Sequence, residues 1–170
     1  AGGPDGKGPR YHELSIDEIQ QEVQHFVDAA KRAKASNFDA IEIHAGHGYL
    51  ISSFLSPAVN KRTDEYGGTP EKRAKILIEI ISEIKNHIED FPILVRLDAN
   101  EYRIENGITP ADFLITAFMA QEAGADAIDV SAYGNTSKGI AFTEAPLVHE
   151  PGGFLDFVKM AKKELTIPII

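Results

Sequence analysis

Apolar residues recur along the chain in two alternating patterns, helical spacing in some segments and short continuous runs in others. The first helical pattern begins at a capping box formed by Ser15 and Glu18 and ends near Asn37, a residue type that tolerates a left-handed backbone. Two later helices begin at a Thr-Pro pair, because proline at the first helical position loses no hydrogen bond. The sequence predicts helices on this basis over residues 15–37, 69–88, 109–124 and 154–165.

Short β-branched runs lie between these helices and predict strands. Each run is too short for a helix and apolar on both faces, which is typical of parallel strands covered by helices. Residues 37–45 and 124–132 share one order of features, a helix end followed by an acidic residue and a strand. Repeated βα units predict an α/β fold, part of a (β/α)8 TIM barrel, with a doubly wound sheet as the alternative. The predicted strands are 38–43, 93–97 and 127–131, and another begins at 167–170.

The number of βα units is smaller than a closed barrel requires, since a barrel has eight strands, eight helices and about 250 residues. The chain also stops inside an apolar strand, and open sheet edges of this kind associate readily. We therefore expect residues 1–170 to be a single partial TIM-barrel domain that supplies about four βα units of a longer protein. We also expect it to form a homo-oligomer or to self-associate through its open sheet edges.

Composition narrows the possible partners. Hydrophobic residues make up 43% and charged residues 25% of the chain, as in ordinary globular proteins. The net charge of −9 argues against binding to nucleic acid or to an anionic membrane surface. No apolar run approaches the roughly 20 residues that cross a bilayer. The chain has no cysteine, which excludes disulfides and thiol chemistry and fits a reducing compartment, so we expect a cytoplasmic protein.

The connection from Ala45 to Pro70 has no helical or strand pattern, and a loop of this length in a compact domain is normally functional. His44, His47 and Tyr49 stand at its start. The two imidazoles could hydrogen-bond a carbonyl or an oxyanion, or bind a metal ion. A phenol with an unperturbed pKa of about 10 can deliver a proton at neutral pH. This cluster is therefore the candidate site.

Other polar residues fall at the predicted carboxyl ends of strands, where parallel βα folds gather their catalytic groups: Arg96, Asp98 and Ser131, beside His44. Arg96 interrupts an apolar strand, which is costly unless its charge meets an anion or a polarised group. Two interpretations stay open for Arg96, a functional cation or an ion pair with Asp98 or Glu42. Charged residues within 62–73 predict either a solvated run or an ion-pair network that tethers the loop.

The run FDAIEIHAGHGYL at 38–50, with FLSP at 54–57, Asn60 and RTDEYGG at 62–68, resembles the Old Yellow Enzyme family. These are FMN-dependent NAD(P)H:flavin oxidoreductases and ene-reductases. The helix that begins EKR at 71–73, and the strands containing VRL at 95–97 and AIDVS at 127–131, continue the likeness. The resemblance covers nearly the whole chain.

This resemblance implies an FMN-bearing (β/α)8 barrel in which the chain supplies roughly strands four to seven. His44 and His47 would hold the carbonyl oxygen of a small enone-type substrate. Tyr49 would protonate the α-carbon while flavin N5 delivers hydride to the β-carbon. Arg96 would lie against the N1/O2 edge of the flavin and stabilise the reduced ring. NADH or NADPH would reduce the flavin again.

Two features depart from the family pattern. The glutamine-bearing third strand and the glycine-rich phosphate loops lie outside this chain, so we expect these residues alone to bind FMN weakly or not at all. In addition, TEAP at 143–146 has threonine where the dienoyl-CoA reductase branch has histidine. That difference favours a simpler ene-reductase or an NADH oxidase.

Two other functions stay open. A barrel hydrolase or lyase could use His44 and His47 as metal ligands, although no acidic residue lies at a familiar ligand spacing from the pair and further ligands would have to come from distant strands. A non-catalytic half-barrel could serve as an assembly piece.

Overall fold

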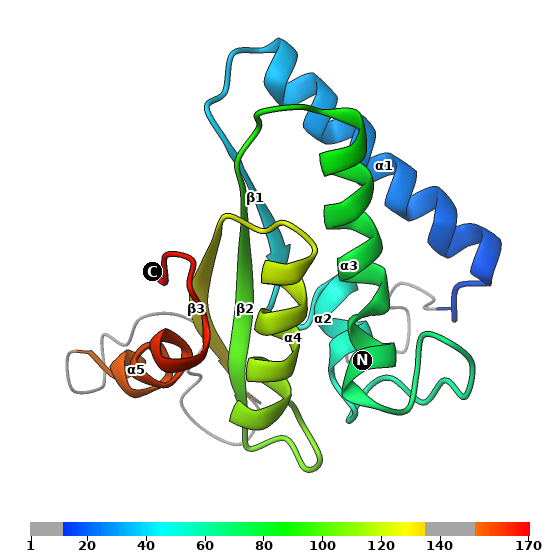
Figure 1. Cartoon of the computed structure of the whole chain (residues 1–170). Helices are drawn as coiled ribbons and strands as arrows, with labels where there is room; N and C mark the ends of the chain where they lie inside the picture. Colours follow the sequence, from blue (N-terminus) through cyan, green and yellow to red (C-terminus); the bar gives the residue numbers. More distant parts are fainter. Residues whose placement is uncertain (1–11, 135–151) are drawn as a thin grey trace, which may run out of the picture.

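The computed structural model describes residues 12–134 and 152–170, which form a parallel sheet with helices between its strands (Figure 1). The strands are β1 (Ile41–Ala45), β2 (Ile93–Tyr102) and β3 (Ala127–Gly134). The helices are α1 (Ile16–Ala35), α2 (Leu50–Leu55), α3 (Pro70–His87), α4 (Pro110–Glu122) and α5 (Leu155–Glu164). The α/β class predicted from the sequence is confirmed.

The sheet has the order β1-β2-β3 with every neighbouring pair parallel. At the far edge of β3, Ile169 forms one parallel bridge with Ile128, so the last predicted strand is reduced to a single bridge in the described residues. Pro168 contributes only its carbonyl to this pairing, accepting from the N–H of Ile128, because proline has no N–H to donate. Consecutive parallel βα units fit part of a (β/α)8 barrel. The assignment to strands four to seven, and the single-domain boundary, stay predictions.

The predicted helix starts are confirmed by their caps. Ser15 and Glu18 form both bonds of the capping box of α1. Thr69 caps α3 by accepting the N–H of Lys72, and Pro70 occupies the first helical turn. At the end of α1, Asn37 has φ 60°, the left-handed conformation that its residue type tolerates. Local sequence therefore determines where these helices begin and end.

The prediction that the segment from 45 to 70 has no helix is wrong, because α2 lies within it. The N-cap residue Tyr49 makes no side-chain capping bond, and six residues are too few for a helix that is stable by itself. Burial of Ile51, Phe54 and Leu55 stabilises α2 instead. Strand ends also differ from prediction, since β1 starts later than residue 38 and both β2 and β3 continue beyond 97 and 131.

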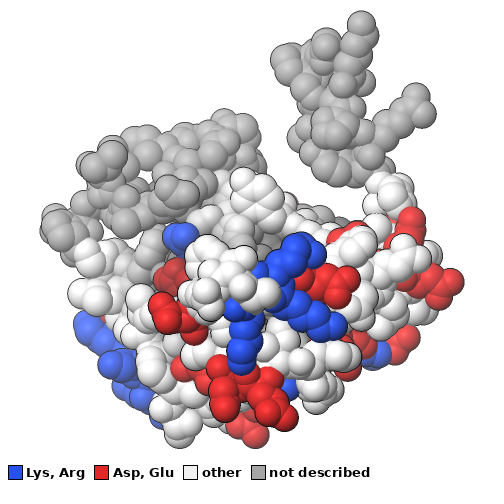
Figure 2. Space-filling model, turned by 90° about the horizontal axis from the view of Figure 1, so that it is seen from above, with Lys and Arg blue, Asp and Glu red and all other residues white. Residues whose placement is uncertain are grey.

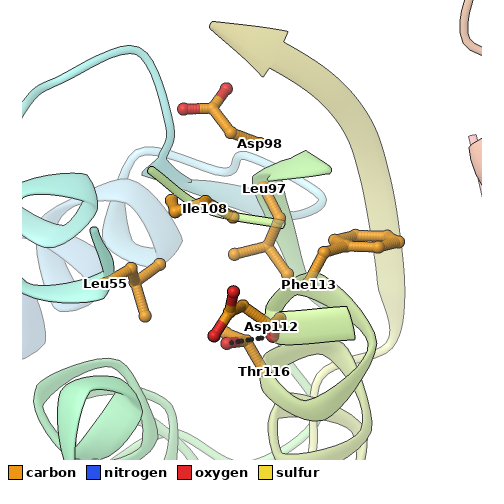
Figure 3. Close-up of a pocket in the computed structure, with 7 residues that line it drawn as sticks. All are labelled: Leu55, Leu97, Asp98, Ile108, Asp112, Phe113 and Thr116. Carbon is orange, nitrogen blue, oxygen red and sulfur yellow. Dashed lines mark hydrogen bonds between the residues drawn. The ribbon is translucent and has the colours of Figure 1, made fainter. Parts of the chain in front are cut away.

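The two faces of the sheet differ in what covers them. On one face, Ile43, Val95 and Ile128 are buried beneath α3 and α4, which run alongside the strands in Figure 1. The predicted apolar stripe of α3 is confirmed as part of this core: Leu77, Ile80, Ile81, Ile84 and Ile88. A small pocket remains among α2, β2 and α4, and Figure 3 shows the side chains that line it. The other face carries partly exposed polar residues and holds the candidate site.

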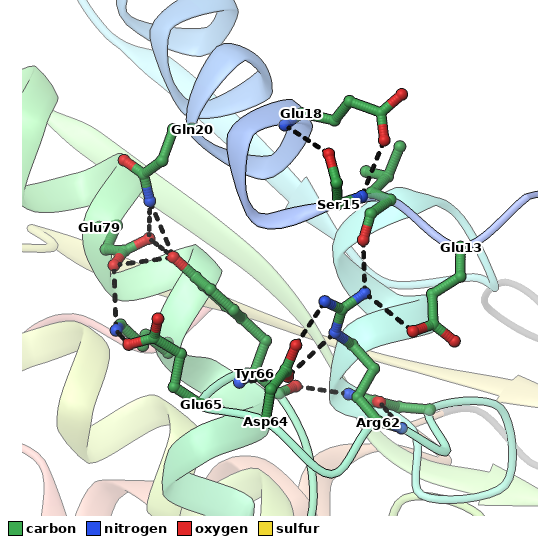
Figure 4. Close-up of polar contacts among 12 residues, drawn as sticks. Glu13, Ser15, Glu18, Gln20, Arg62, Asp64, Glu65, Tyr66 and Glu79 are labelled. Carbon is green, nitrogen blue, oxygen red and sulfur yellow. Dashed lines mark hydrogen bonds and ion pairs between the residues drawn. The ribbon is translucent and has the colours of Figure 1, made fainter.

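Two arginines tie the long loop down, which confirms the tethering interpretation of its charges. Arg62 binds Asp64 through Nε at 3.1 Å and Nη2 at 2.5 Å, and donates from Nη1 to the carbonyl of Leu14 at 2.6 Å (Figure 4). Tyr66 is buried below this pair and its hydroxyl donates to Glu79 at 2.9 Å. The loop is therefore fixed to α1 and α3.

The second arginine, Arg73, is buried at the start of α3. It donates to the carbonyls of Leu55 at 2.8 Å and Gly68 at 2.5 Å, and to Asp112 of α4 at 2.6 Å. One side chain thus holds the end of α2, the end of the loop and α4 together.

On the face of the molecule in Figure 2, acidic and basic side chains are interspersed, so the described part of that face has no surface of one charge sign. Within residues 12–134 and 152–170, no helix combines the length and the apolar character that crossing a bilayer would take.

Candidate active site

Three polar residues occupy paired positions across the strands. His44 lies in register with Arg96, and Arg96 with Asp129, so all three side chains are on one face of the sheet. Nε of Arg96 lies 3.3 Å from Oδ2 of Asp129. This corrects the interpretation that Arg96 pairs with Asp98 or Glu42. Its acidic partner is the register neighbour on β3.

The guanidinium of Arg96 has room for a further anionic partner. Its Nε is buried and has no hydrogen-bond partner among the described residues, while 32% of the side chain is exposed. A cation in an apolar strand is normally stabilised by several charge-assisted hydrogen bonds. The face that carries His44 and Arg96 can therefore accept an anionic or polarised group.

A tight turn after β1 gathers the two histidines and the tyrosine. His47 and Gly48 have φ of 59° and 74°, a left-handed pair that reverses the chain, and the N–H of Tyr49 then donates to the carbonyl of Gly46 at 3.4 Å. The ring of His44 consequently lies 5.0 Å from that of His47 and 5.3 Å from that of Tyr49. Tyr49 is 65% exposed, so its phenol is open to a ligand.

His47 is held by residues from two other strands. Its Nε2 lies 2.7 Å from the hydroxyl of Ser131 on β3. Its main-chain N–H donates to Oδ2 of Asp98 on β2 at 2.6 Å, and Oδ1 of Asp98 lies 3.6 Å from Nε2. The strand-end residues Arg96, Asp98 and Ser131 thus meet the two histidines at the carboxyl end of the sheet. Their chemical roles stay predictions.

Close packing restricts the residues of this turn. A Cβ on Gly46 would lie 2.9 Å from Oδ1 of Asp98, so only glycine lets the turn approach that carboxyl group. A Cβ on Gly48 would lie 3.3 Å from the ring of Tyr133, which stacks on the ring of His47 with centroids 6.5 Å apart. Tyr133 therefore extends the row of rings beyond His47.

Burial controls the ionisation of two site residues. Burial, and then the charge of Arg96, lower the pKa of His44, with Asp129 acting in the opposite direction. His44 is therefore a neutral imidazole at neutral pH and can donate one hydrogen bond. Burial raises the pKa of Asp98 to about 7, against the opposing hydrogen bond from the N–H of His47. Asp98 accordingly changes its charge near neutrality.

Sequence reasoning missed Tyr133 and gave no role to Asp98 or Ser131. Tyr133 lies beyond the predicted end of its strand, but it follows Ser131 by two residues and so shares its face. That spacing was the available signal. The burial of Asp98 depends on the packing of α2 and the turn, which no local pattern encodes.

Two alternative chemistries find little support in the geometry. Among the described residues, no group of three or more histidine and acidic side chains could hold a metal ion, so the hypothesis of a His44–His47 metal site has no further ligand there. Asp98, His47 and Ser131 are also not arranged as a hydrolase triad. Both neighbours approach Nε2 of His47, whereas in a triad the acid holds Nδ1.

Comparison with known proteins identifies the family. Residues 6–163 match the model of the NADH:flavin oxidoreductase / NADH oxidase family, and the chain belongs to that family. The resemblance to the Old Yellow Enzyme family drawn from residues 38–68 is confirmed. The segment 143–146, used to compare the dienoyl-CoA reductase branch, lies outside the described residues.

Among curated relatives, the NADH oxidase of Thermoanaerobacter brockii is 41% identical over 169 residues, which cover 96% of this chain and 25% of that protein. The NADPH dehydrogenase of Bacillus subtilis is 49% identical over 120 residues, covering 71% of this chain and 35% of that protein. The chain therefore spans about a third or less of the length of these two relatives.

Solved structures share the fold. A 2-naphthoyl-CoA reductase in complex with 2-naphthoyl-CoA has a TM-score of 0.84 at 32% identity, over 93% of this chain and 24% of that one. The Old Yellow Enzyme homologue from Zymomonas mobilis has a TM-score of 0.72 at 26% identity, over 98% of this chain and 45% of that one.

Proposed function

We propose that the full-length protein is an FMN-dependent NAD(P)H oxidoreductase that reduces activated C=C bonds of α,β-unsaturated carbonyl compounds. The observation that carries the proposal is the convergence of His44, His47 and Tyr49 on the face of the sheet that also presents Arg96. Family membership supports the flavin and the nicotinamide reductant. The names of relatives include both NADH and NADPH enzymes and do not choose between them.

In this proposal His44 and His47 hold the carbonyl oxygen of the substrate. Their rings are 5.0 Å apart, which places two hydrogen-bonding groups around one small region. A neutral His44 donates a hydrogen bond without adding a charge that would have to be desolvated. Polarising the carbonyl in this way draws electron density from the conjugated double bond, and it stabilises the negative charge that develops on the oxygen during reduction.

Tyr49 is the proposed proton donor. Its ring lies 5.3 Å from that of His44, and its side chain is exposed, so it can reach the α-carbon of a substrate whose oxygen is bound at the histidines. A phenol donates its proton effectively to a carbon that is becoming basic, because the transfer does not require the enzyme to hold a strong acid at neutral pH.

Arg96 is the residue of this chain that fits FMN. Its Nε is buried without a hydrogen-bond partner among the described residues, and the ion pair with Asp129 holds the guanidinium on the His44 face. A guanidinium at that position suits the polar N1/O2 edge of an isoalloxazine ring and favours extra negative charge there. FMN, when bound, supplies the hydride for the β-carbon.

The proposed partner is a small enone-type molecule.

We further propose that the sheet edges are covered by further chain or by another copy of the protein, since β1 pairs only with β2 within the described residues. Cytoplasmic location stays an expectation from the sequence.

The proposal is tested with the full-length protein loaded with FMN and reduced anaerobically with NADH or NADPH. Mixing with 2-cyclohexenone should form the saturated ketone in proportion to the enzyme present. A protein that binds no flavin but hydrolyses substrates after addition of zinc would favour the metal-dependent alternative. Self-association without flavin uptake would favour the non-catalytic assembly piece.

A second experiment tests the oxygen site itself. Phenols mimic the substrate oxygen, so His44→Ala should weaken phenol binding to the FMN-loaded protein by about tenfold, the loss expected for one hydrogen bond to a charged group. His25→Ala, on the exposed side of α1, is the matched control and should leave binding unchanged. Equal affinity in the wild type and His44→Ala would contradict the role of His44.

A further inference from the structure

Asp98 is a buried carboxyl group that the proposed roles above do not use. The residue is 2% exposed. Its Oδ2 accepts a hydrogen bond from the N–H of His47 at 2.6 Å and a weaker one from the hydroxyl of Ser52 at 3.5 Å. Its Oδ1 is buried without a hydrogen-bond partner among the described residues. An ionised carboxylate in such a place is costly, so its presence beside His47 needs a functional explanation.

The surroundings of Asp98 favour its neutral form. In Figure 3 the carboxyl group of Asp98 points away from Leu97 and Phe113, which line the small pocket on the helix side of β2. Its burial comes from the turn after β1, because Gly46 packs directly against its carboxyl oxygens. The polar and titratable groups around Asp98 come from several elements: Arg96 and Glu101 on β2, His47 in the turn after β1, Ser52 on α2, Asp112 across the small pocket on α4, and Ser131 in register on β3.

The charge of Asp98 depends on pH in the range where enzymes work. Burial is the main cause that raises its pKa to about 7, and the charge of Glu101 acts in the same direction. The N–H of His47, the hydroxyl of Ser52 and the charge of Arg96 oppose this shift. Oδ1 of Asp98 lies 3.6 Å from Nε2 of His47, too far for a hydrogen bond but close enough for its charge to act on a group bound at that ring. Loss of the proton of Asp98 therefore places one negative charge beside the ring of His47.

We propose that Asp98 is a positioning residue that fixes the turn and ring of His47, and whose ionisation weakens the binding of oxyanions at His44 and His47. This inference rests on the proposed function, because it requires an oxygen ligand at the two histidines. The direction of this pH effect on binding follows from charge alone, since a carboxylate 3.6 Å from Nε2 of His47 repels an anion bound by that ring. The site therefore holds an oxyanion best below neutral pH.

The experiment measures the dissociation constant of pentafluorophenol with the FMN-loaded full-length protein, read from the change in flavin absorption. Fluorine acidifies this phenol enough to keep it largely ionised from about pH 6.5 to about pH 9, so its own titration contributes little. In the wild type the dissociation constant should rise about tenfold across this range. Asp98→Asn keeps the shape and removes the charge, so its dissociation constant should stay nearly constant.

Two further variants make the result specific. Asp98→Ser also removes the charge, with a smaller side chain, and should show the same flat profile if Asp98→Asn does not fold. Glu101→Gln neutralises another buried carboxyl group on the same strand, one that binds Ser56 and the N–H of Ile108 and not His47. Its profile should still slope, with the midpoint moved to lower pH, because the charge of Glu101 helps to raise the pKa of Asp98.

Each outcome decides the inference. Flat profiles in the neutral Asp98 variants, with a sloping profile in Glu101→Gln, support it. A slope that is equal in the wild type and the Asp98 variants overturns the role of Asp98 and leaves the proposed function intact. If the wild type fails to bind the phenolate at any pH, the proposed oxygen site fails and this inference fails with it.

Discussion

His44 and Arg96 occupy paired positions on β1 and β2, so an imidazole and a guanidinium face the same side of the sheet. The nearby positive charge adds to burial in lowering the pKa of His44. The pairing therefore does more than hold two strands in register. It adds to the effect of burial in favouring neutral His44, the form that donates a hydrogen bond without carrying a charge.

Replacing Arg96 should change the titration of His44. In Arg96→Met the repulsion by the guanidinium is lost and Asp129 is left without its partner, and both changes raise the pKa of His44. The measurement is an NMR pH titration of the His44 ring in the full-length protein. Arg32→Met, in the last turn of α1, is the control and should leave the pKa of His44 unchanged. A lower or unchanged pKa in Arg96→Met would contradict the coupling.

Asp98→Asn should gain stability relative to the wild type as the pH rises. The pKa of Asp98 is about 7 when folded and near the ordinary aspartate value of 3.8 when unfolded. A raised folded-state pKa gives stability that is fully present below the unfolded value and is lost as the pH rises through 7. Between about pH 5 and about pH 8, the free energy of unfolding of Asp98→Asn should therefore rise by roughly 2 kcal/mol relative to that of the wild type.

Thermal or denaturant unfolding of both proteins at the two pH values measures this shift. A difference in free energy of unfolding that does not depend on pH would mean that Asp98 is ionised throughout.

Tyr49→Phe should slow alkene reduction more than reduction of the flavin by NADH, since only the first step uses the phenol proton. Stopped-flow absorption follows the two half-reactions separately, and a loss of about 100-fold in alkene reduction is expected for a missing general acid. Tyr133→Phe removes the phenol that stacks on His47 and should have a smaller effect. Equal slowing of both half-reactions in Tyr49→Phe would refute the role of Tyr49.

Arg73→Met should destabilise the fold. The change leaves the buried carbonyl of Leu55, and the partly buried Asp112 and carbonyl of Gly68, without their shared donor, which costs about 3 kcal/mol. Lys72→Met is the matched control, because Lys72 is the exposed neighbour in the same helical turn. Denaturant unfolding measures both. Similar free energies of unfolding for the two variants would show that the loop is not tethered by Arg73.

The extent to which sequence predicts this fold follows from where each feature is encoded. Helix starts are local, because Ser15, Glu18 and Thr69 accept the first N–H groups within a few residues and Pro70 has no N–H that needs an acceptor. Parallel strands are readable because they are short β-branched runs between helical patterns, although the structure places His44 and Arg96 on a polar face of the sheet. By contrast, α2 has no cap and depends on burial, so its sequence does not distinguish it from a loop.

The candidate site shows the same division. His44, His47 and Tyr49 are close in sequence, and the family motif around them is specific. The choice of Asp129 as the partner of Arg96 depends on strand register, which is set by the whole sheet. The burial of Asp98 depends on how closely the glycine turn approaches β2. Such features require the packed structure.

The central claim is that these side chains face a flavin that accepts electrons from a nicotinamide. The most direct test is the visible absorption spectrum of the full-length protein, recorded without oxygen before and after NADH or NADPH is added. The proposed function predicts flavin bands that bleach on addition of the reductant and return when an enone is supplied. A colourless protein, or flavin bands that neither nucleotide bleaches, would contradict it.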